Sequence, residues 1–172
     1  MGTIRRASHD DQALLGELAD DVFSLYGSDY GLMIPAYARD IRVITLIYEE
    51  DGAQAGFIQV GFLEAPGTGR ELIADILAVA VAPGFQNLGY GTALFQRVFE
   101  LLRPMRERGT VADIQLTVAH TNDRATRLFE RLGFRVVQSD YGLYEGGQRA
   151  IRMGLGPLPA PIDSSLRDRP RK

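Results

Sequence analysis

Residues 79–92 decide the fold, and they read Val-Ala-Val-Ala-Pro-Gly-Phe-Gln-Asn-Leu-Gly-Tyr-Gly-Thr. This stretch contains the end of an apolar strand, a turn with three glycines and the start of an amphipathic helix. Pro83 is expected to end the strand, and Gly84, Gly89 and Gly91 are expected to allow backbone angles that a side chain would forbid. Such a turn directs several unpaired N–H groups to the helix start, which is where phosphate groups bind. The stretch therefore predicts a phosphate-binding loop.

The spacing of the glycines excludes two common phosphate-binding patterns. The dinucleotide-binding fingerprint needs a small residue three positions after Gly91, but Leu94 stands there. Gly84 and Gly89 have the spacing of the two P-loop glycines, but Tyr90 and Gly91 follow in place of the required lysine and Ser/Thr. The pattern that remains is Gln-x-x-Gly-x-Gly, from Gln86 to Gly91.

A second pattern follows downstream of the loop. Residues 116–118 read as a short buried strand, and residues 122–134 read as a helix that Asn122 caps and Gly133 ends. The intervening residues are enough for one helix and a crossover, as a strand-helix-strand unit requires. The two patterns therefore predict a parallel pair of strands around the helix that begins near Gly89.

Together these two patterns resemble the GNAT superfamily of acetyl-CoA-dependent N-acyltransferases, over the span from Asp75 to Phe134. The resemblance implies an α/β (α+β) fold: a mixed, mostly antiparallel sheet of about six or seven strands with helices on both faces. It also implies an N-acetyltransferase that moves an acetyl group from acetyl-CoA to a primary amine, by direct attack through a tetrahedral intermediate.

The resemblance assigns the cofactor contacts residue by residue, with acetyl-CoA as the acyl donor. The pantetheine arm would lie on the backbone of Val79, Ala80 and Val81. The pyrophosphate would lie on the N–H groups of Gln86, Asn87, Leu88, Gly89, Tyr90, Gly91 and Thr92. Asn122 would contact the cofactor as well, although asparagine is also among the best helix caps and both roles are open.

Three residues are candidates for the proton transfers. Asp75 interrupts an apolar strand and matches the general base of the histone-acetylating branch of the family; pairing with an arginine from a neighbouring strand is the alternative. The family commonly has a tyrosine acid where this chain has Phe129, and phenylalanine cannot donate a proton. Tyr141 and Tyr144 are therefore the candidate acids, unless the thiolate leaves unassisted. Phe129 also supports a second hypothesis, a non-catalytic acyl-CoA-binding sensor or regulatory module.

The amino-acid composition narrows the classes of function that this chain can have. The chain has 172 residues, no cysteine, two histidines and a net charge of −3, with its basic residues scattered. These counts disfavour metal sites and nucleic-acid binding, and no segment is apolar and long enough to be a signal sequence or to cross a bilayer. We therefore expect a cytoplasmic protein with one domain over residues 1–155, a Pro-rich flexible tail over 156–172, no metal and no membrane partner. The amine acceptor and a possible homodimer are left open.

Periodicity predicts the other elements. Strands are expected at residues 3–6, 43–49, 56–64, 71–81, 114–118, 134–139 and 149–153. Helices are expected at residues 10–25 and 35–42, and a third runs from the glycines to an end near residues 104–109. The strand over 71–81 should be central, with Ile73, Leu77, Val79 and Val81 on one face and Leu72, Ile76 and the alanines on the other. The acceptor pocket should lie between residues 26–30, the second helix and residues 141–147.

Overall fold

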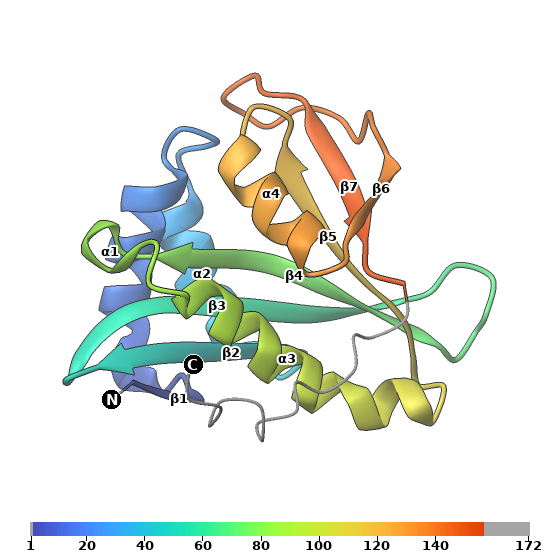
Figure 1. The fold of residues 1–172 in the computed structure, drawn as a ribbon, viewed down its shortest axis with the longest axis horizontal. Helices are drawn as coiled ribbons and strands as arrows, with labels where there is room; N and C mark the ends of the chain where they lie inside the picture. The colour runs from blue at the N-terminus through green and yellow to red at the C-terminus, as the bar shows by residue number, and fades with distance from the viewer. Residues whose placement is uncertain (1, 157–172) are drawn as a thin grey trace, which may run out of the picture.

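One mixed sheet is the centre of the computed structural model, which describes residues 2–156 (Figure 1). Its seven strands within those residues are β1 (Thr3–Arg6), β2 (Val43–Glu50), β3 (Ala53–Glu64), β4 (Leu72–Val81), β5 (Val111–Ala119), β6 (Arg135–Gln138) and β7 (Ala150–Gly154). They lie in the order β1-β2-β3-β4-β5-β7-β6, and only β4 and β5 are parallel neighbours. The predicted mixed, mostly antiparallel sheet is confirmed.

Helices cover both faces of this sheet, as predicted. They are α1 (Gln12–Phe23), α2 (Tyr30–Ala38), α3 (Tyr90–Glu107) and α4 (Asp123–Arg131), with short 3₁₀ helices η1 (His9–Asp11) and η2 (Pro83–Phe85). One buried cluster joins α3 and α4 to the sheet, and a separate cluster joins α1 and α2 to the other face. In Figure 1, α3 and α4 lie in front of the sheet and α1 and α2 lie behind it.

The helix α3 forms where its apolar spacing predicts it. Leu94, Phe95, Val98 and Leu102 recur at helical spacing, and all four are buried against the sheet. The helix was expected to end between Pro104 and Gly109, and it ends at Glu107, before Gly109 takes a positive φ of 70°. The apolar stripe therefore determines the position of the helix, and the proline is accommodated in its last turns.

The second helix differs from its prediction. It was expected over residues 35–42 with Pro35 near its start, but α2 spans Tyr30–Ala38 and contains Pro35. The ring of Tyr30 packs against Phe23 of α1 with centroids 5.2 Å apart, and Ile34 is buried in the α1–α2 cluster. Because these contacts stabilise the turn before Pro35, tertiary packing overrides the local preference of proline for the first helical turn.

A buried carboxylate ties the first strand to η1. Asp11 accepts hydrogen bonds from the Arg5 guanidinium, at 2.8 Å to each of its oxygens, and from the N–H and hydroxyl of Ser8. The Arg5 hydrogen bonds are the largest influence on the Asp11 pKa, and with those from Ser8 they hold it well below its ordinary value despite burial. The folded state therefore favours the ionised form of Asp11.

This lowered pKa predicts an acid-dependent stability. Because the folded pKa lies below the unfolded value of about 4, the contribution of Asp11 is complete above that pH and is lost as the pH falls toward the folded pKa. Asp11→Asn is expected to lower the free energy of unfolding by about 1–3 kcal/mol at neutral pH. The difference from wild type should shrink steadily below about pH 4, as followed by urea unfolding.

The matched control is Asp40→Asn. Asp40 also pairs with an arginine, Arg42, and its pKa is lowered to about 2, chiefly by the hydrogen bond from the Arg42 side chain. The Arg42 side chain is 76% exposed, so solvent screening should leave this pair with little effect on stability. An Asp40→Asn effect as large as that of Asp11→Asn would contradict the prediction.

The sequence prediction of a flexible tail at 156–172 falls on residues outside the described part of the chain, apart from Gly156. No helix within residues 2–156 has the length and apolar character to span a membrane.

Candidate active site

The loop between β4 and α3 has the geometry of an anion site. After η2, Asn87 and Gly89 take positive φ values of 65° and 85°, and α3 begins at Tyr90. Within residues 2–156, none of the N–H groups of residues 87–92 donates a hydrogen bond. Unpaired N–H groups at a helix start carry partial positive charge, so this loop can hold a phosphate group.

Only one of the three loop glycines has the conformation expected of it. Gly89 needs glycine because of its positive φ, whereas Gly84 and Gly91 have no positive φ. Asn87 takes the other left-handed position, which asparagine tolerates better than most residues. The expectation that all three glycines allow forbidden angles is therefore wrong at Gly84 and Gly91.

The strands β4 and β5 form a fork beside this loop. They pair from Leu72 with Val111 to Ile76 with Leu116, and beyond that point β5 pairs only with β7. In Figure 1 the two strands run together at the right and diverge toward the left. Among the described strands, none pairs with the last residues of β4 on the side of β5.

A β-bulge lies where the fork opens. Gln59 of β3 pairs with Ala78 but the next residue, Val60, pairs with Ile76, so Leu77 is the extra residue in β4. A bulge bends and twists its strand, which accounts for the divergence of β4 from β5 at this point. The bulge also changes which sheet face the even-numbered side chains of β4 occupy. Ala74 and Ile76 pack in the α3–α4 cluster, but Ala78 and Ala80 pack in the α1–α2 cluster. The predicted assignment of all the alanines and Ile76 to one face is therefore wrong.

Backbone groups of β4 are available inside the fork. Ala82 N–H donates to Ala55 of the β3 side at 2.9 Å, and backbone groups alternate in direction along a strand. The N–H and C=O groups of Val79 and Val81 therefore point into the fork, and those of Ala80 point toward β3. The Val81 carbonyl accepts a hydrogen bond from Gln86 Nε2 at 2.9 Å, which joins the fork to the loop.

Asn122 is the cap of α4, as the sequence predicted. Its side-chain oxygen accepts a hydrogen bond from the Ala125 N–H at 3.1 Å. Its cofactor contact stays a prediction. Phe129 lies about two helical turns further on. It is buried among Phe95, Phe99 and Phe134, with ring centroids 5.6 Å from Phe95 and 6.1 Å from Phe134.

Asp75 lies in a polar cluster on the sheet face opposite α3. Arg152 of β7 donates from Nη1 to Asp75 Oδ1 at 2.8 Å and to Thr117 Oγ1 at 3.0 Å, and from Nε to Gln115 Oε1 at 3.1 Å. Arg152 is 7% exposed and therefore reaches across β5 beneath the surface. The arginine pairing that the sequence left open is present, although the partner comes from two strands away.

The two candidate tyrosines lie beside this cluster. The Tyr141 ring is 5.2 Å from the Arg152 guanidinium. Burial raises the pKa of Tyr144 well above its ordinary value, with smaller contributions from Tyr30, Tyr26 and the charge of Asp75. The structure therefore brings Asp75, Tyr141 and Tyr144 into one region, with Tyr144 held in its protonated form.

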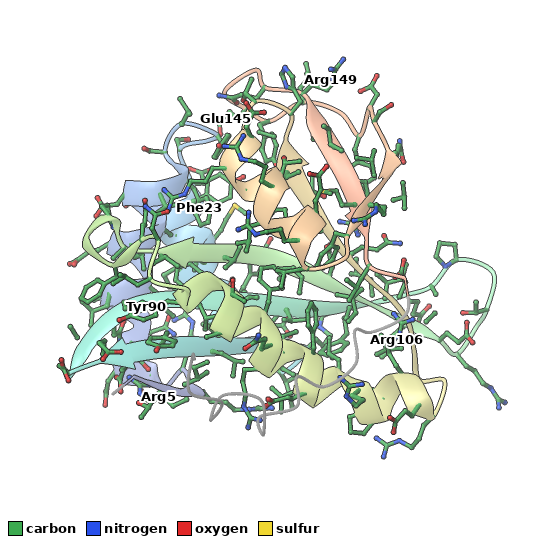
Figure 2. All side chains as sticks on the ribbon, in the orientation of Figure 1. Arg5, Phe23, Tyr90, Arg106, Glu145 and Arg149 are labelled. Carbon is green, nitrogen blue, oxygen red and sulfur yellow. The ribbon has the colours of Figure 1, made fainter. Side chains whose placement is uncertain are left out.

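Two loops close around this region. Gly146 N–H donates to Tyr26 O at 3.0 Å, and the Ser28 hydroxyl donates to Glu145 at 3.1 Å. The rings of Tyr26 and Tyr144 lie 5.3 Å apart. Figure 2 shows Glu145 beside the turn that joins α1 to α2. The predicted acceptor loops are thus in contact, although they are more than a hundred residues apart in the chain.

Sequence reasoning missed two arginines that the structure places at the site. Arg124 donates to Gln86 Oε1 at 2.5 Å and to Asn87 Oδ1 at 3.1 Å, and Arg152 pairs with Asp75. Arg152 carried a signal, since it interrupts an apolar strand. Arg124 carried none, because it is one of several arginines on a polar helix face. Within residues 2–156, no group of three or more histidine, aspartate or glutamate residues could hold a metal ion.

An open fork that ends at a phosphate-binding loop is the arrangement expected of an acetyl-CoA-dependent acetyltransferase. The model of the acetyltransferase (GNAT) family matches residues 13–134, which is well over half of the chain. The chain therefore belongs to the GNAT family of acetyltransferases.

Individual relatives agree with this assignment. The chain is 33% identical over 94 residues to mycothiol acetyltransferase of Propionibacterium freudenreichii, covering 55% of this chain and 28% of that protein. It is 32% identical over 109 residues to streptothricin acetyltransferase of Streptomyces lavendulae, covering 61% and 53%. The chain thus spans about a quarter and about half of these two proteins.

The fold is also that of NAA60 of Arabidopsis thaliana. The TM-scores are 0.75 for its complex with a bisubstrate analogue and 0.73 for its complex with acetyl-CoA. The match covers 90% of this chain and 98% and 97% of those chains, at 17% and 16% identity.

Proposed function

We propose that this protein transfers the acetyl group of acetyl-CoA to a primary amine, by direct attack through a tetrahedral intermediate. The observation that carries the proposal is the fork, because the backbone groups of Val79 and the N–H of Val81 face into it beside the unpaired N–H groups of the loop. The Val81 carbonyl is the group that Gln86 joins to the loop. An extended pantetheine arm would bond to Val79 and Val81 as an added strand, and the pyrophosphate would bind the N–H groups of residues 87–92. Ala80 would contribute only its small side chain.

The chemical step needs a neutral amine and support for the developing oxyanion. The amine nitrogen attacks the thioester carbon, the carbon–sulfur bond breaks, one proton leaves the nitrogen and the thiolate takes one up. The N–H of Val79 or Val81 would stabilise the oxyanion. Tyr141 and Tyr144 stay the candidate donors of a hydrogen bond to the leaving sulfur, and burial keeps the Tyr144 hydroxyl protonated by raising its pKa.

Asp75 fits a general base less well than a structural partner. Its Oδ1 already accepts a hydrogen bond from Arg152, which leaves Oδ2 for a water or an amine. We therefore propose that Asp75 positions the strands of the fork, and an Asp75→Asn variant separates the two roles.

The acceptor would approach through the α1–α2 and β6–β7 turns. Tyr26 and Tyr144 supply aromatic surface there, and Glu145 supplies an exposed carboxylate. Aromatic and acidic groups together favour a cationic acceptor. The names of the two relatives refer to mycothiol and to streptothricin, so the acceptor panel should be broad.

Calorimetric titration followed by thiol detection tests the proposal. The protein is titrated with acetyl-CoA, coenzyme A and NADH, and free thiol is then measured with peptides, polyamines, amino acids and aminoglycoside-like antibiotics. We expect binding of acetyl-CoA but not NADH, and thiol release that depends on an amine. Binding without release by any amine would favour the non-catalytic acyl-CoA sensor, for which the buried Phe129 is the supporting observation. Absence of coenzyme A binding would refute both functions.

A further inference from the structure

The side chain of Arg124 spans the open end of the fork. Arg124 lies in the first turn of α4, and its two terminal nitrogens donate to the side chains of Gln86 and Asn87 in the loop before α3. In Figure 1 this loop and the start of α4 lie on the two sides of the fork. Gln86 in turn donates to the Val81 carbonyl at the end of β4. One chain of hydrogen bonds thus connects α4, the loop and β4.

In the described part of the chain, the charge of Arg124 has no carboxylate partner. Both acceptors are neutral amide oxygens, and no ion pair of Arg124 occurs within residues 2–156. Residues 82–92 contain no acidic side chain. The exposed Arg124 guanidinium therefore lies beside the unpaired N–H groups of the loop. The charge of the guanidinium and the partial charges of the N–H groups together make this end of the fork positive.

We propose that Arg124 binds the phosphate groups of the acyl donor. This inference rests on the proposed function, since it needs a phosphorylated donor in the loop. A guanidinium presents parallel N–H donors that match phosphate oxygens, and a charge-assisted hydrogen bond is stronger than one to an amide. Phosphate oxygens would replace the two amide oxygens as acceptors, and the positions of Gln86 and Asn87 hold the guanidinium ready for that exchange.

The same helix supplies a matched control. Arg127 is also exposed, carries the same charge and lies one turn along α4, where it lines a shallow hollow with Glu130, Arg131 and Arg135. It has no hydrogen bond to the loop within the described residues. Arg127→Gln therefore changes the net charge by the same amount as Arg124→Gln without removing the contact.

The experiment compares the dissociation constants of coenzyme A and pantetheine, which lacks the phosphates. We expect Arg124→Gln to weaken coenzyme A binding by about 10- to 100-fold, the effect of one charge-assisted hydrogen bond, and to leave pantetheine binding unchanged. Arg127→Gln should change coenzyme A binding by less than about threefold, as expected for an exposed charge. Arg124→Lys keeps the charge but loses the paired N–H donors of the guanidinium. Its dissociation constant for coenzyme A should therefore lie between those of wild type and Arg124→Gln.

Salt dependence separates a direct phosphate contact from a role in ordering the loop. A direct charge contact weakens with salt, so the difference between wild type and Arg124→Gln should shrink between about 0.05 M and about 0.5 M salt. A difference that salt leaves unchanged would overturn the inference, as would equal losses in Arg124→Gln and Arg127→Gln. An unchanged coenzyme A affinity in Arg124→Gln would overturn the inference about Arg124. The proposed function would still stand in that case, because wild type binds coenzyme A. No coenzyme A binding by wild type would remove both.

Discussion

Replacing Arg152 with methionine is expected to lower the free energy of unfolding by about 3 kcal/mol. Arg152 is 7% exposed and makes hydrogen bonds to Asp75, Gln115 and Thr117, so its side chain joins β7 to β5 and β4. Methionine has a similar length but no charge or donor, and it would leave the Asp75 carboxylate without its partner. Urea unfolding monitored by circular dichroism measures the change.

The control for this prediction is Arg149→Met. Arg149 lies just before β7 on the surface, as Figure 2 shows, and its side chain is exposed. The same substitution there should change the free energy of unfolding by less than about 0.5 kcal/mol. Similar effects at 149 and 152 would mean that the buried ion pair does not stabilise the fold.

Asp75→Asn then separates a structural role from a catalytic one. The asparagine keeps an oxygen for Arg152 but cannot act as a base. If Asp75 positions the strands, turnover should stay within about tenfold of wild type, and the double variant Asp75→Asn/Arg152→Met should show a coupling energy of about 2 kcal/mol. A loss of turnover of more than about 100-fold in a folded Asp75→Asn protein would return Asp75 to the role of general base.

Replacing Gly91 with alanine is expected to weaken acetyl-CoA binding by at least about tenfold without loss of stability. A Cβ atom at Gly91 would lie 3.5 Å from Leu128 of α4 and 3.8 Å from Val81 of β4, which are ordinary contacts. The folded protein therefore has room for the methyl group, and alanine favours the helix over glycine. In the proposed binding mode, however, that methyl group would narrow the space in which the donor passes from the loop into the fork.

Gly84→Ala provides the comparison for Gly91→Ala. Gly84 precedes the run of unpaired N–H groups, has no positive φ, and its Cβ would meet no atom within 4 Å. Its substitution should leave both the thermal midpoint and the acetyl-CoA dissociation constant near the wild-type values. If Gly91→Ala binds acetyl-CoA as tightly as Gly84→Ala does, the donor does not pass between Val81 and α4.

The turn with unpaired N–H groups before α3 could be predicted from sequence because its causes are local. Pro83 stops a strand, Gly89 takes the left-handed conformation, and the apolar stripe of α3 begins a few residues later. The α4 cap at Asn122 is equally local, since its acceptor and donor lie three residues apart. The order of strand, loop and helix then leaves few possible topologies for the pair of parallel strands.

The errors arose where distant segments decide the conformation. The α2 helix starts earlier than proline preference suggests because Tyr30 and Ile34 pack against α1. The faces of β4 change at Leu77 because a bulge in the pairing with β3 adds one residue, which alternation along a single strand cannot reveal. Glycine content alone also could not show that Gly84 and Gly91 have ordinary φ angles.

The sequence by itself determined the mixed sheet, the turn before α3 and the family resemblance, because strand period, helix stripe and turn chemistry act over a few neighbouring residues. Only the tertiary structure decided the contents of the site. Arg152 donates a hydrogen bond to Asp75, 77 residues earlier in the chain, and Arg124 donates one to Gln86, 38 residues earlier. Such contacts depend on how far β4 and β5 diverge and on which faces the helices cover. Those are properties of the packed sheet as a whole, and no local pattern of residues encodes them.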